Sequence, residues 1–285
     1  MGGELYIEGQ ALKFKEFNLS DMVKNATIVM IAKRGSGKSW CVKHILKYLD
    51  DTGIPGGTII SPTDDVHPFY SKFVPDLYIH YEFEPEILRK IFYRQDRIIE
   101  KRKQRAKLRK RVDARVFLVM DDCLGDGKKW KNDPDIRKIF MNGRHHQITF
   151  ILTMQYPLGI GPELRTNIDY VFLLTDDIIS NQKRLFDNYA GMFPDYNTFR
   201  AVYLNLTEDF GAMVINNRCS SRDIYDKVFY FKAKRQNDDR IGCRQFKDIH
   251  DINYDSHYKD KPTNYDISKF AKQHKKEDIK VIKEK

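Results

Sequence analysis

The sequence lacks any apolar run that approaches the ~20 residues of a membrane-spanning helix, so it predicts no contact with a membrane. Its first residues hold no apolar segment of the signal-peptide type, and Tyr6 stands where an N-myristoylation signal needs Ser or Thr. Only four cysteines occur, scattered, with no C-x-x-C pair and no histidine at zinc-finger spacing. This scarcity favours reduced thiols in a reducing compartment and argues against a disulfide or zinc framework.

What the chain does have is enough apolar sequence for a large core and a surplus of positive charge. Hydrophobic residues make up 41% of 285, which argues against global disorder and allows one large α/β domain. The formal net charge is +10, and the densest cationic run is 101–111. Such a surplus favours a polyanionic partner, and the run is compatible with nucleic-acid contact, an acidic partner or simple solvation.

Apolar, β-branched runs alternate with segments whose apolar residues have helical spacing. This alternation predicts a mostly parallel sheet covered by helices on both faces. Strands are expected at 26–32, 57–62, 77–83, 115–122, 148–155 and 170–177, and a late edge hairpin at 211–217 and 227–233. Helices are expected at 37–50, 84–111, 133–143, 178–190 and 197–206. We therefore expect one α/β domain over 1–233, with a basic helical extension at about 84–111, and a polar basic tail over 234–285.

The loop after the first buried strand fits the phosphate-loop pattern G-x-x-x-x-G-K-[ST], except that Ala32 replaces the first glycine. Gly35 and Gly37 let the backbone turn its N–H groups inward, and the following helix points its positive end at the same place. Lys38 is expected to reach the β- and γ-phosphates of ATP, and Ser39 to bind Mg²⁺. The nucleotide-binding set is Arg34, Gly35, Ser36, Gly37, Lys38 and Ser39.

Polar residues end two later strands of the expected sheet. Asp121 and Asp122 end the strand at 115–122, and Gln155 ends the strand at 148–155. The carboxyl ends of parallel strands form the edge at which open α/β sheets bind ligands. We therefore expect Asp121 to hold Mg²⁺ in the Walker B role, Asp122 to polarise the attacking water, and Gln155 to orient water or sense the γ-phosphate. Taken alone, each residue is also compatible with a loop cap or a strand end.

Hydrolysis at such sites is often completed by an arginine that stabilises charge in the transition state. Arg144 and Arg165 lie on loops that flank the strand carrying Gln155, and either is placed to reach the nucleotide of a neighbouring subunit. Arg144 is the preferred finger, and the choice between the two stays open. His145 and His146 have no third ligand at a suitable spacing, so we interpret them as loop residues.

Four motifs together, "AKRGSGKS", "FLVMDD", "NGRHHQITFILTMQ" and "LRTNIDYVFLL", resemble the genome-packaging ATPases of large double-stranded DNA viruses, in the FtsK–HerA branch of P-loop ATPases. The likeness covers roughly residues 24–217. It implies a RecA-like P-loop core that forms a hexameric or pentameric ring. By position it assigns Lys38 and Ser39 to phosphate and magnesium, Asp121 to Walker B, Asp122 to catalysis, Gln155 to sensing and Arg144 to the finger.

The chain departs from the family pattern at two positions. Ala32 replaces the first loop glycine, which a small residue at a strand end tolerates. Asp122 stands where many relatives in this ATPase division carry Glu. Because Asp is one methylene shorter, the attacking water must lie closer or be relayed, which leaves the identity of the base open but not the binding of ATP.

The resemblance implies a motor that hydrolyses ATP with Mg²⁺ and moves viral double-stranded DNA, independently of base sequence, into a preformed capsid. Capsid vertex proteins are then the expected partners, and the host cytoplasm, a virus factory or the virion the expected location. Two alternatives stay open from the residues, a P-loop kinase acting on a small molecule and a nucleotide-gated scaffold without turnover. A GTPase is disfavoured, because no N-K-x-D motif for reading guanine occurs.

Overall fold

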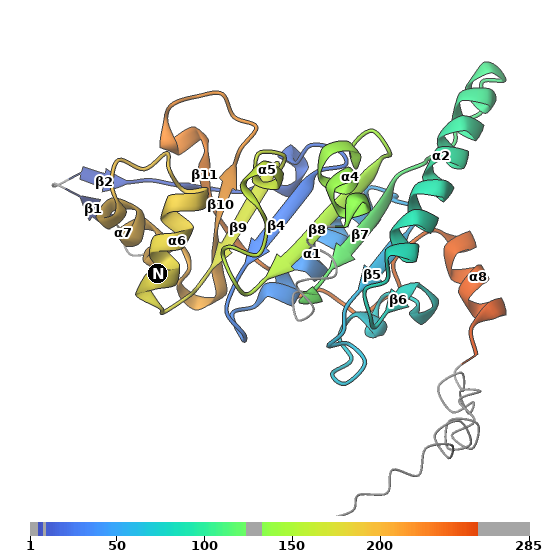
Figure 1. Ribbon diagram of the computed structural model, residues 1–285, viewed down its shortest axis with the longest axis horizontal. Coiled ribbons are helices and arrows are strands. Elements are labelled where there is room, and N and C mark those ends of the chain that lie inside the picture. The colour runs from blue at the N-terminus through green and yellow to red at the C-terminus, as the bar shows by residue number, and fades with distance from the viewer. Residues whose placement is uncertain (1–4, 8–9, 124–132, 256–285) are drawn as a thin grey trace, which may run out of the picture.

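In a computed structural model of the chain, residues 5–7, 10–123 and 133–255 are described, and they build one sheet of nine strands with helices on both faces (Figure 1). From edge to edge the sheet contains β3 (Lys15–Glu16), β11 (Val228–Lys232), β10 (Gly211–Asn216), β9 (Tyr170–Leu174), β4 (Thr27–Ile31), β8 (Ile148–Met154), β7 (Val116–Met120), β5 (Gly57–Ile60) and β6 (Ile79–His80). A separate antiparallel pair is formed by β1 (Leu5–Ile7) and β2 (Gln10–Leu12).

The helices divide between the two faces of the sheet (Figure 1). One face is covered by α1 (Lys38–Asp51). The other carries α2 (Pro85–Lys107), α4 (Pro134–Asn142), α5 (Pro162–Arg165), α6 (Ile179–Tyr189) and α7 (Tyr196–Leu206). Near the β6 edge, α8 (Arg244–Asn253) lies beside the start of α2 (Figure 1). None of the helices in the described ranges combines the length and apolar character that spanning a bilayer requires.

The continuous apolar runs of the sequence arise because the central strands are buried on both faces. In β4, Val29 and Ile31 pack into the core beneath α2, α4, α6 and α7, whereas Ile28 and Met30 pack into the core beneath α1. All five residues of this strand are buried. A strand covered on both sides has no polar face, so it shows no alternation in the sequence.

The expectation of a mostly parallel sheet is confirmed. Strands β6, β5, β7, β8, β4 and β9 are parallel, and only β10 runs antiparallel to its neighbours. The expected late hairpin exists as β10 and β11, although β3 adds one more short parallel strand outside it. Within this order β8 separates β4, which leads into the phosphate loop, from β7, which ends before the two aspartates. The order therefore brings three strand ends to one site.

The basic helix is shorter than expected from the sequence. It ends at Lys107 rather than at Arg111, because Arg109 has a left-handed φ of 52° and the Lys110 amide donates to Arg105 O at 3.0 Å. These bonds close the last turn of the helix. The end of α2 extends past the sheet (Figure 1), and every side chain from 101 to 111 is exposed.

Residues just after Lys234, where a polar tail was expected to begin, still pack on the domain. Asp238 forms an ion pair with the buried Lys43, and the fully buried Ile241 donates its amide to Phe73 O at 2.9 Å. These contacts continue to α8, so residues 234–255 pack on the domain that precedes them. The polar tail expected over 234–285 stays a prediction only for 256–285, which lie outside the described residues.

Candidate functional site

The loop between β4 and α1 has the backbone of an anion-binding nest. Gly35 and Gly37 have left-handed φ values of 75° and 91°, which residues with a Cβ adopt only at a cost. Gly37 is the N-cap of α1 and offers no side chain to the first N–H groups of the helix. These N–H groups therefore point, unpaired by a cap, to the place where an anion would lie.

Ala32, which replaces the first glycine of the motif, continues the sheet. It is buried, and its amide donates to Met154 O at 3.0 Å as the next bond of the β4–β8 ladder. Ser36 closes the loop by donating its hydroxyl to Lys33 O at 2.8 Å, and Lys33 itself forms an ion pair with Asp177 after β9. The loop is thus fixed to two neighbouring strands, while Arg34 remains exposed.

The structure brings Lys38, Asp121, Asp122 and Gln155 together at the carboxyl edge of the sheet. Lys38 Nζ donates to Asp122 Oδ1 and lies 3.8 Å from Asp121 Oδ1. Gln155 Nε2 donates to Asp122 Oδ2 at 2.9 Å. Thr153, the penultimate residue of β8, donates its hydroxyl to Asp121 and accepts the Asp122 amide at 3.1 Å. One threonine therefore fixes the positions of both aspartates.

The two aspartates have different environments. Asp121 is 3% exposed, and burial raises the pKa of its carboxyl above the ordinary value, although Lys38 and the Thr153 hydroxyl act in the opposite direction. Asp122 is more exposed and has a left-handed φ of 52°, a conformation that non-glycine residues rarely adopt. Its bonds to Thr153 and Gln155 hold this strained conformation, which turns the carboxylate toward Lys38.

A buried tyrosine indicates that the site fits Mg²⁺ with its water shell. Tyr70 is 1% exposed, and its hydroxyl lies close to the side chains of both Asp121 and Ser39. Burial and the nearby charge of Asp121 raise its pKa, and Ser39 acts on the same hydroxyl. A buried hydroxyl between Asp121 and Ser39 is suited to contact a metal-bound water, since buried polar groups normally find partners.

The donor set also suits this metal. Mg²⁺ usually binds one or two protein oxygens and completes its octahedron with water and substrate phosphates. Asp121 and Ser39 are such a pair. No group of three or more His, Cys, Asp or Glu side chains that could hold a metal occurs within 5–7, 10–123 and 133–255, so a site that coordinates its metal through side chains of these types alone is not indicated there.

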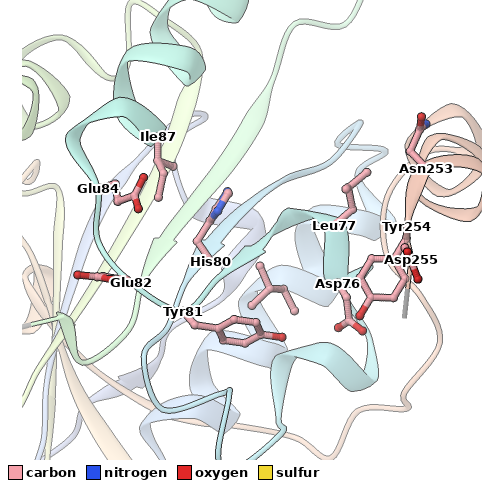
Figure 2. A pocket seen from close by; sticks show the side chains of 11 residues that line it. Asp76, Leu77, His80, Tyr81, Glu82, Glu84, Ile87, Asn253, Tyr254 and Asp255 are labelled. Carbon is pink, nitrogen blue, oxygen red and sulfur yellow. The ribbon is translucent and has the colours of Figure 1, made fainter. Parts of the chain in front are cut away.

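A cavity of about 740 Å³ lies over the phosphate loop. Its walls combine the loop and the start of α1 with residues from four other segments. The lining residues are Lys33, Arg34, Gly35, Gly37, Lys38, Ser39, Trp40, Phe69, Asp122, Phe210, Lys232, Ala233 and Arg235. A second hollow, of about 480 Å³, lies between β6, the start of α2 and the end of α8 (Figure 2). Its walls carry Asp76, Glu82, Glu84 and Asp255, so it is the less suitable place for a triphosphate.

Arg144 lies at the amino ends of the parallel strands, whereas the phosphate loop of its own subunit lies at their carboxyl ends. It precedes β8, whose seven residues span roughly 20 Å, and β8 runs parallel to β4. Its guanidinium forms an ion pair with the buried Asp169 at 2.5 Å, and Arg218 contacts the same oxygen at 3.1 Å. The second oxygen of Asp169 accepts the Thr27 amide at 2.8 Å. The structure thus separates Arg144 from the other predicted site residues of the same chain.

Arg165, the alternative finger, is engaged within the chain. It donates to Asn188 Oδ1 at 2.5 Å and lies 5.6 Å from the ring centre of Tyr189, both on α6. Arg144 is also paired within the chain, with Asp169, but its side chain is 46% exposed. It also lines a hollow of about 900 Å³ whose other walls are largely cationic, with Lys24, Arg102, Arg109, Lys110, Arg111 and Arg115. The basic run and Arg144 therefore share one surface.

Sequence reasoning missed four residues at these places, namely Tyr70, Thr153, Phe210 and Arg218. Thr153 carried a usable signal, since it is the one hydroxyl near the end of an apolar strand that borders the aspartates. Arg218 carried a weaker signal. It follows the apolar strand β10, and because β10 is antiparallel to its neighbours this places it beside Arg144, which precedes β8. Tyr70 and Phe210 lie far from the motifs along the chain, and nothing in their local sequence marks them.

The sequence has close relatives among viral proteins. The uncharacterized protein L437 of Acanthamoeba polyphaga mimivirus is 48% identical over 243 residues, which span 85% of this chain and 84% of L437. The uncharacterized protein 075L of Invertebrate iridescent virus 6 is 32% identical over 243 residues, 83% of this chain and 89% of 075L. No protein-family model matches the sequence.

Solved structures with the same fold include two nucleotide complexes. The genome packaging NTPase B204 from Sulfolobus turreted icosahedral virus 2, in complex with AMPPCP, has a TM-score of 0.51 at 15% identity, over 74% of this chain and 99% of B204. The pCW3 conjugation coupling protein TcpA, with ATPgS, has a TM-score of 0.50 at 14% identity, over 79% of this chain and 65% of TcpA. At these identities the likeness shows the fold alone. The P-loop NTPase fold expected from the sequence, and its likeness to viral packaging ATPases, are thereby confirmed.

Proposed function

This chain belongs to the family of viral proteins that includes L437 and 075L, and we propose that it hydrolyses ATP to move double-stranded DNA into a viral capsid. One observation carries the proposal. Asp121 and Asp122 follow β7, Gln155 follows β8, and Lys38 comes from the phosphate loop after β4, and the four converge in one place. A cation, two carboxylates and an amide beside an anion nest are the parts that hydrolysis of a phosphoanhydride requires.

In the proposed mechanism the loop N–H groups and Lys38 bind the β- and γ-phosphates. Lys38 must then exchange Asp122 for the triphosphate, which frees that carboxylate to orient water for in-line attack. Asp121 and Ser39 would hold Mg²⁺, which would supply charge neutralisation at the phosphate oxygens. Gln155 donates to Asp122, so a change at the γ-phosphate is transmitted to the end of β8.

We place the complete site between subunits of a hexameric or pentameric ring, with Arg144 as the finger. Arg144 lies roughly 20 Å from the loop end of its own sheet, at the other edge, so it can act only on the nucleotide of a neighbour. Asp169 fixes its guanidinium, and Arg218 lies beside it as a second cation. Arg165 is the less suited finger because Arg144 keeps a side chain that is 46% exposed and lines the cationic hollow, whereas the structure gives Arg165 contacts with α6.

The cationic end of α2 is the proposed DNA contact. Its exposed cationic side chains over 101–111 suit contact with phosphates, which position a protein on DNA without reading its sequence. Binding through phosphates makes the interaction independent of sequence and steeply dependent on salt. Capsid vertex proteins are the proposed docking partners, and the host cytoplasm, a virus factory or the virion the proposed places of action.

The test is ATP turnover with and without long double-stranded DNA, at low and high salt. Wild type is compared with Asp122→Asn and with Asp187→Asn, a matched removal of an exposed carboxylate on α6. We expect turnover that DNA stimulates and salt suppresses, lost in the first variant and retained in the second. Turnover that ignores DNA would favour the small-molecule kinase, and ATP binding without turnover would favour the scaffold.

A further inference from the structure

The cavity over the phosphate loop contains two aromatic side chains that are not buried. Trp40 is 45% exposed and Phe210 is 61% exposed, although large aromatic residues normally contribute to a core. Trp40 is partly packed, edge-on against Phe69 at 5.6 Å between ring centres. Phe210 belongs to neither of the two hydrophobic cores of the described residues. Its exposure inside a cavity that also carries cationic side chains suits a ligand with both an aromatic face and negative charge.

The backbone holds Phe210 in this position in an unfavourable conformation. Asp209 and Phe210 have left-handed φ values of 47° and 61°, and such values are rare for a bulky side chain. Two restraints maintain them. Asp209 forms an ion pair with Lys232 on β11, and the next residue begins β10, which is paired on both sides. Strain of this kind persists where the surrounding structure imposes it, and it concentrates at ligand sites.

The topology explains why this aromatic residue faces the phosphate loop. Because β10 runs antiparallel to β9, the start of β10 lies at the same sheet edge as the end of β4. The ring is in fact next to the loop, since a Cβ placed on Gly37 would lie 3.4 Å from Phe210 Cδ1. The cavity that both residues line is about 740 Å³, within the range of small-molecule sites.

We propose that Phe210 is the stacking platform for the purine ring of the bound nucleoside triphosphate, with Trp40 on another wall of the same cavity. This inference rests on the proposed function, because it presupposes that the loop binds a triphosphate. The ring provides a π-face beside the phosphate nest and no hydrogen-bonding group. Stacking of this kind adds affinity without reading the base, because every base has a π-face.

The test separates the base from the phosphates. Dissociation constants are measured by calorimetry, with Mg²⁺, for ATP, GTP and inorganic tripolyphosphate. The variants are Phe210→Ala, Phe210→Trp, which keeps an aromatic face, and the control Tyr93→Ala, which removes an exposed ring on α2. We expect Phe210→Ala to weaken ATP and GTP about tenfold and to leave tripolyphosphate unchanged. Phe210→Trp and Tyr93→Ala should bind all three ligands as wild type does.

Each failure has a distinct meaning. Wild-type affinity for ATP in Phe210→Ala would overturn the platform while leaving the proposed phosphate site intact. Equal weakening of ATP and tripolyphosphate in that variant would also overturn it, because the ring would then act by shaping the loop. If the wild-type chain bound neither ATP nor tripolyphosphate, the proposed function would fail, and the platform with it.

Discussion

Lys38 should stabilise the ligand-free chain as well as bind phosphate, so its removal is expected to lower the free energy of unfolding. The side chain is 8% exposed, is paired with Asp122, and lies 3.8 Å from the buried Asp121. In Lys38→Ala these two carboxylates lose their cation while the fold keeps them close together. The variant is the usual negative control for a phosphate loop, and its stability must therefore be known before its activity is interpreted.

The magnitude follows from the burial of the pair. Removing one partner of a buried ion pair typically costs about 3–5 kcal/mol, because the remaining charge is left without compensation. For a domain of nearly this size 1 kcal/mol shifts the melting temperature by about 2–4 °C, so we expect a decrease on the order of 10 °C. Asp122 is partly exposed, which places the expected loss toward the lower limit.

The loss should depend on pH in a defined direction. Burial raises the pKa of Asp121, and Lys38 opposes that rise, so removing Lys38 raises the pKa further. A carboxyl whose folded-state pKa lies above its unfolded value loses stability as pH rises through that interval. Lys38→Ala should therefore be much less stable than wild type at pH 8. The difference should shrink at pH 5, where Asp121 can take up a proton.

The assay is urea unfolding at pH 5 and pH 8 of wild type, Lys38→Ala, Asp121→Asn and the double variant. Because Asn removes the buried charge, the double variant should be less destabilised than the sum of the two single effects. Lys90→Ala, which removes an exposed lysine on α2, is the matched control and should not change stability. Additive single effects, or a loss for Lys38→Ala that is equal at both pH values, would refute the reasoning.

Three further perturbations follow from other contacts. Gly37→Ala should cost about 1–2 kcal/mol in urea unfolding, because the glycine has a φ of 91°, and should abolish tripolyphosphate binding; unchanged binding would contradict the nest. Asp169→Asn should reduce DNA-stimulated turnover with ATP affinity unchanged, because Asp169 fixes Arg144; a parallel loss of affinity would contradict the separation of the two edges. Burial lowers the pKa of His250, whose Nδ1 accepts the Leu77 amide, so protection of that amide from hydrogen exchange should fall as pH drops below 6.5, and His250→Gln should remove this dependence.

The convergence of the proposed phosphate-site residues could be predicted from the sequence because they follow buried parallel strands. Such strands are apolar throughout, so the polar residues at their ends, Asp121, Asp122 and Gln155, stand out without an alignment. Parallel strands also carry their ends to a common edge, which is why motifs more than a hundred residues apart could be assigned to one site. The sequence placed Arg144 only on a loop beside the strand of Gln155, and the structure shows that this loop lies at the other ends of the strands, because Arg144 precedes β8.

The parts that sequence reasoning missed depend on contacts between distant segments. Residues 234–255 bury few apolar side chains. They are held by polar contacts, such as the ion pair of Lys43 with Asp238 and the backbone bond of Ile241 with Phe73. Their sequence therefore contains no apolar run from which packing could be predicted. The buried Asp64 carboxylate accepts hydrogen bonds from the backbone amides of Phe69, Tyr70 and Ser71. The turn that these bonds hold, rather than a sequence motif, places Tyr70 beside Asp121. Neither feature has a periodic pattern that a sequence would show.

The separation of Arg144 from the phosphate loop also constrains the assembly. If an arginine at one sheet edge completes a site at the opposite edge of a neighbour, the contact is heterologous, and repeating it generates a closed ring or an open filament. Mixing Arg144→Ala with Asp122→Asn tests this directly, since each variant alone should be inactive. In a mixed assembly the Asp122→Asn subunit supplies Arg144 to a neighbour that retains Asp122, so about a quarter of the interfaces should regain turnover when equal amounts associate at random. Mixtures as inactive as the separate variants would argue that Arg144 does not act between subunits.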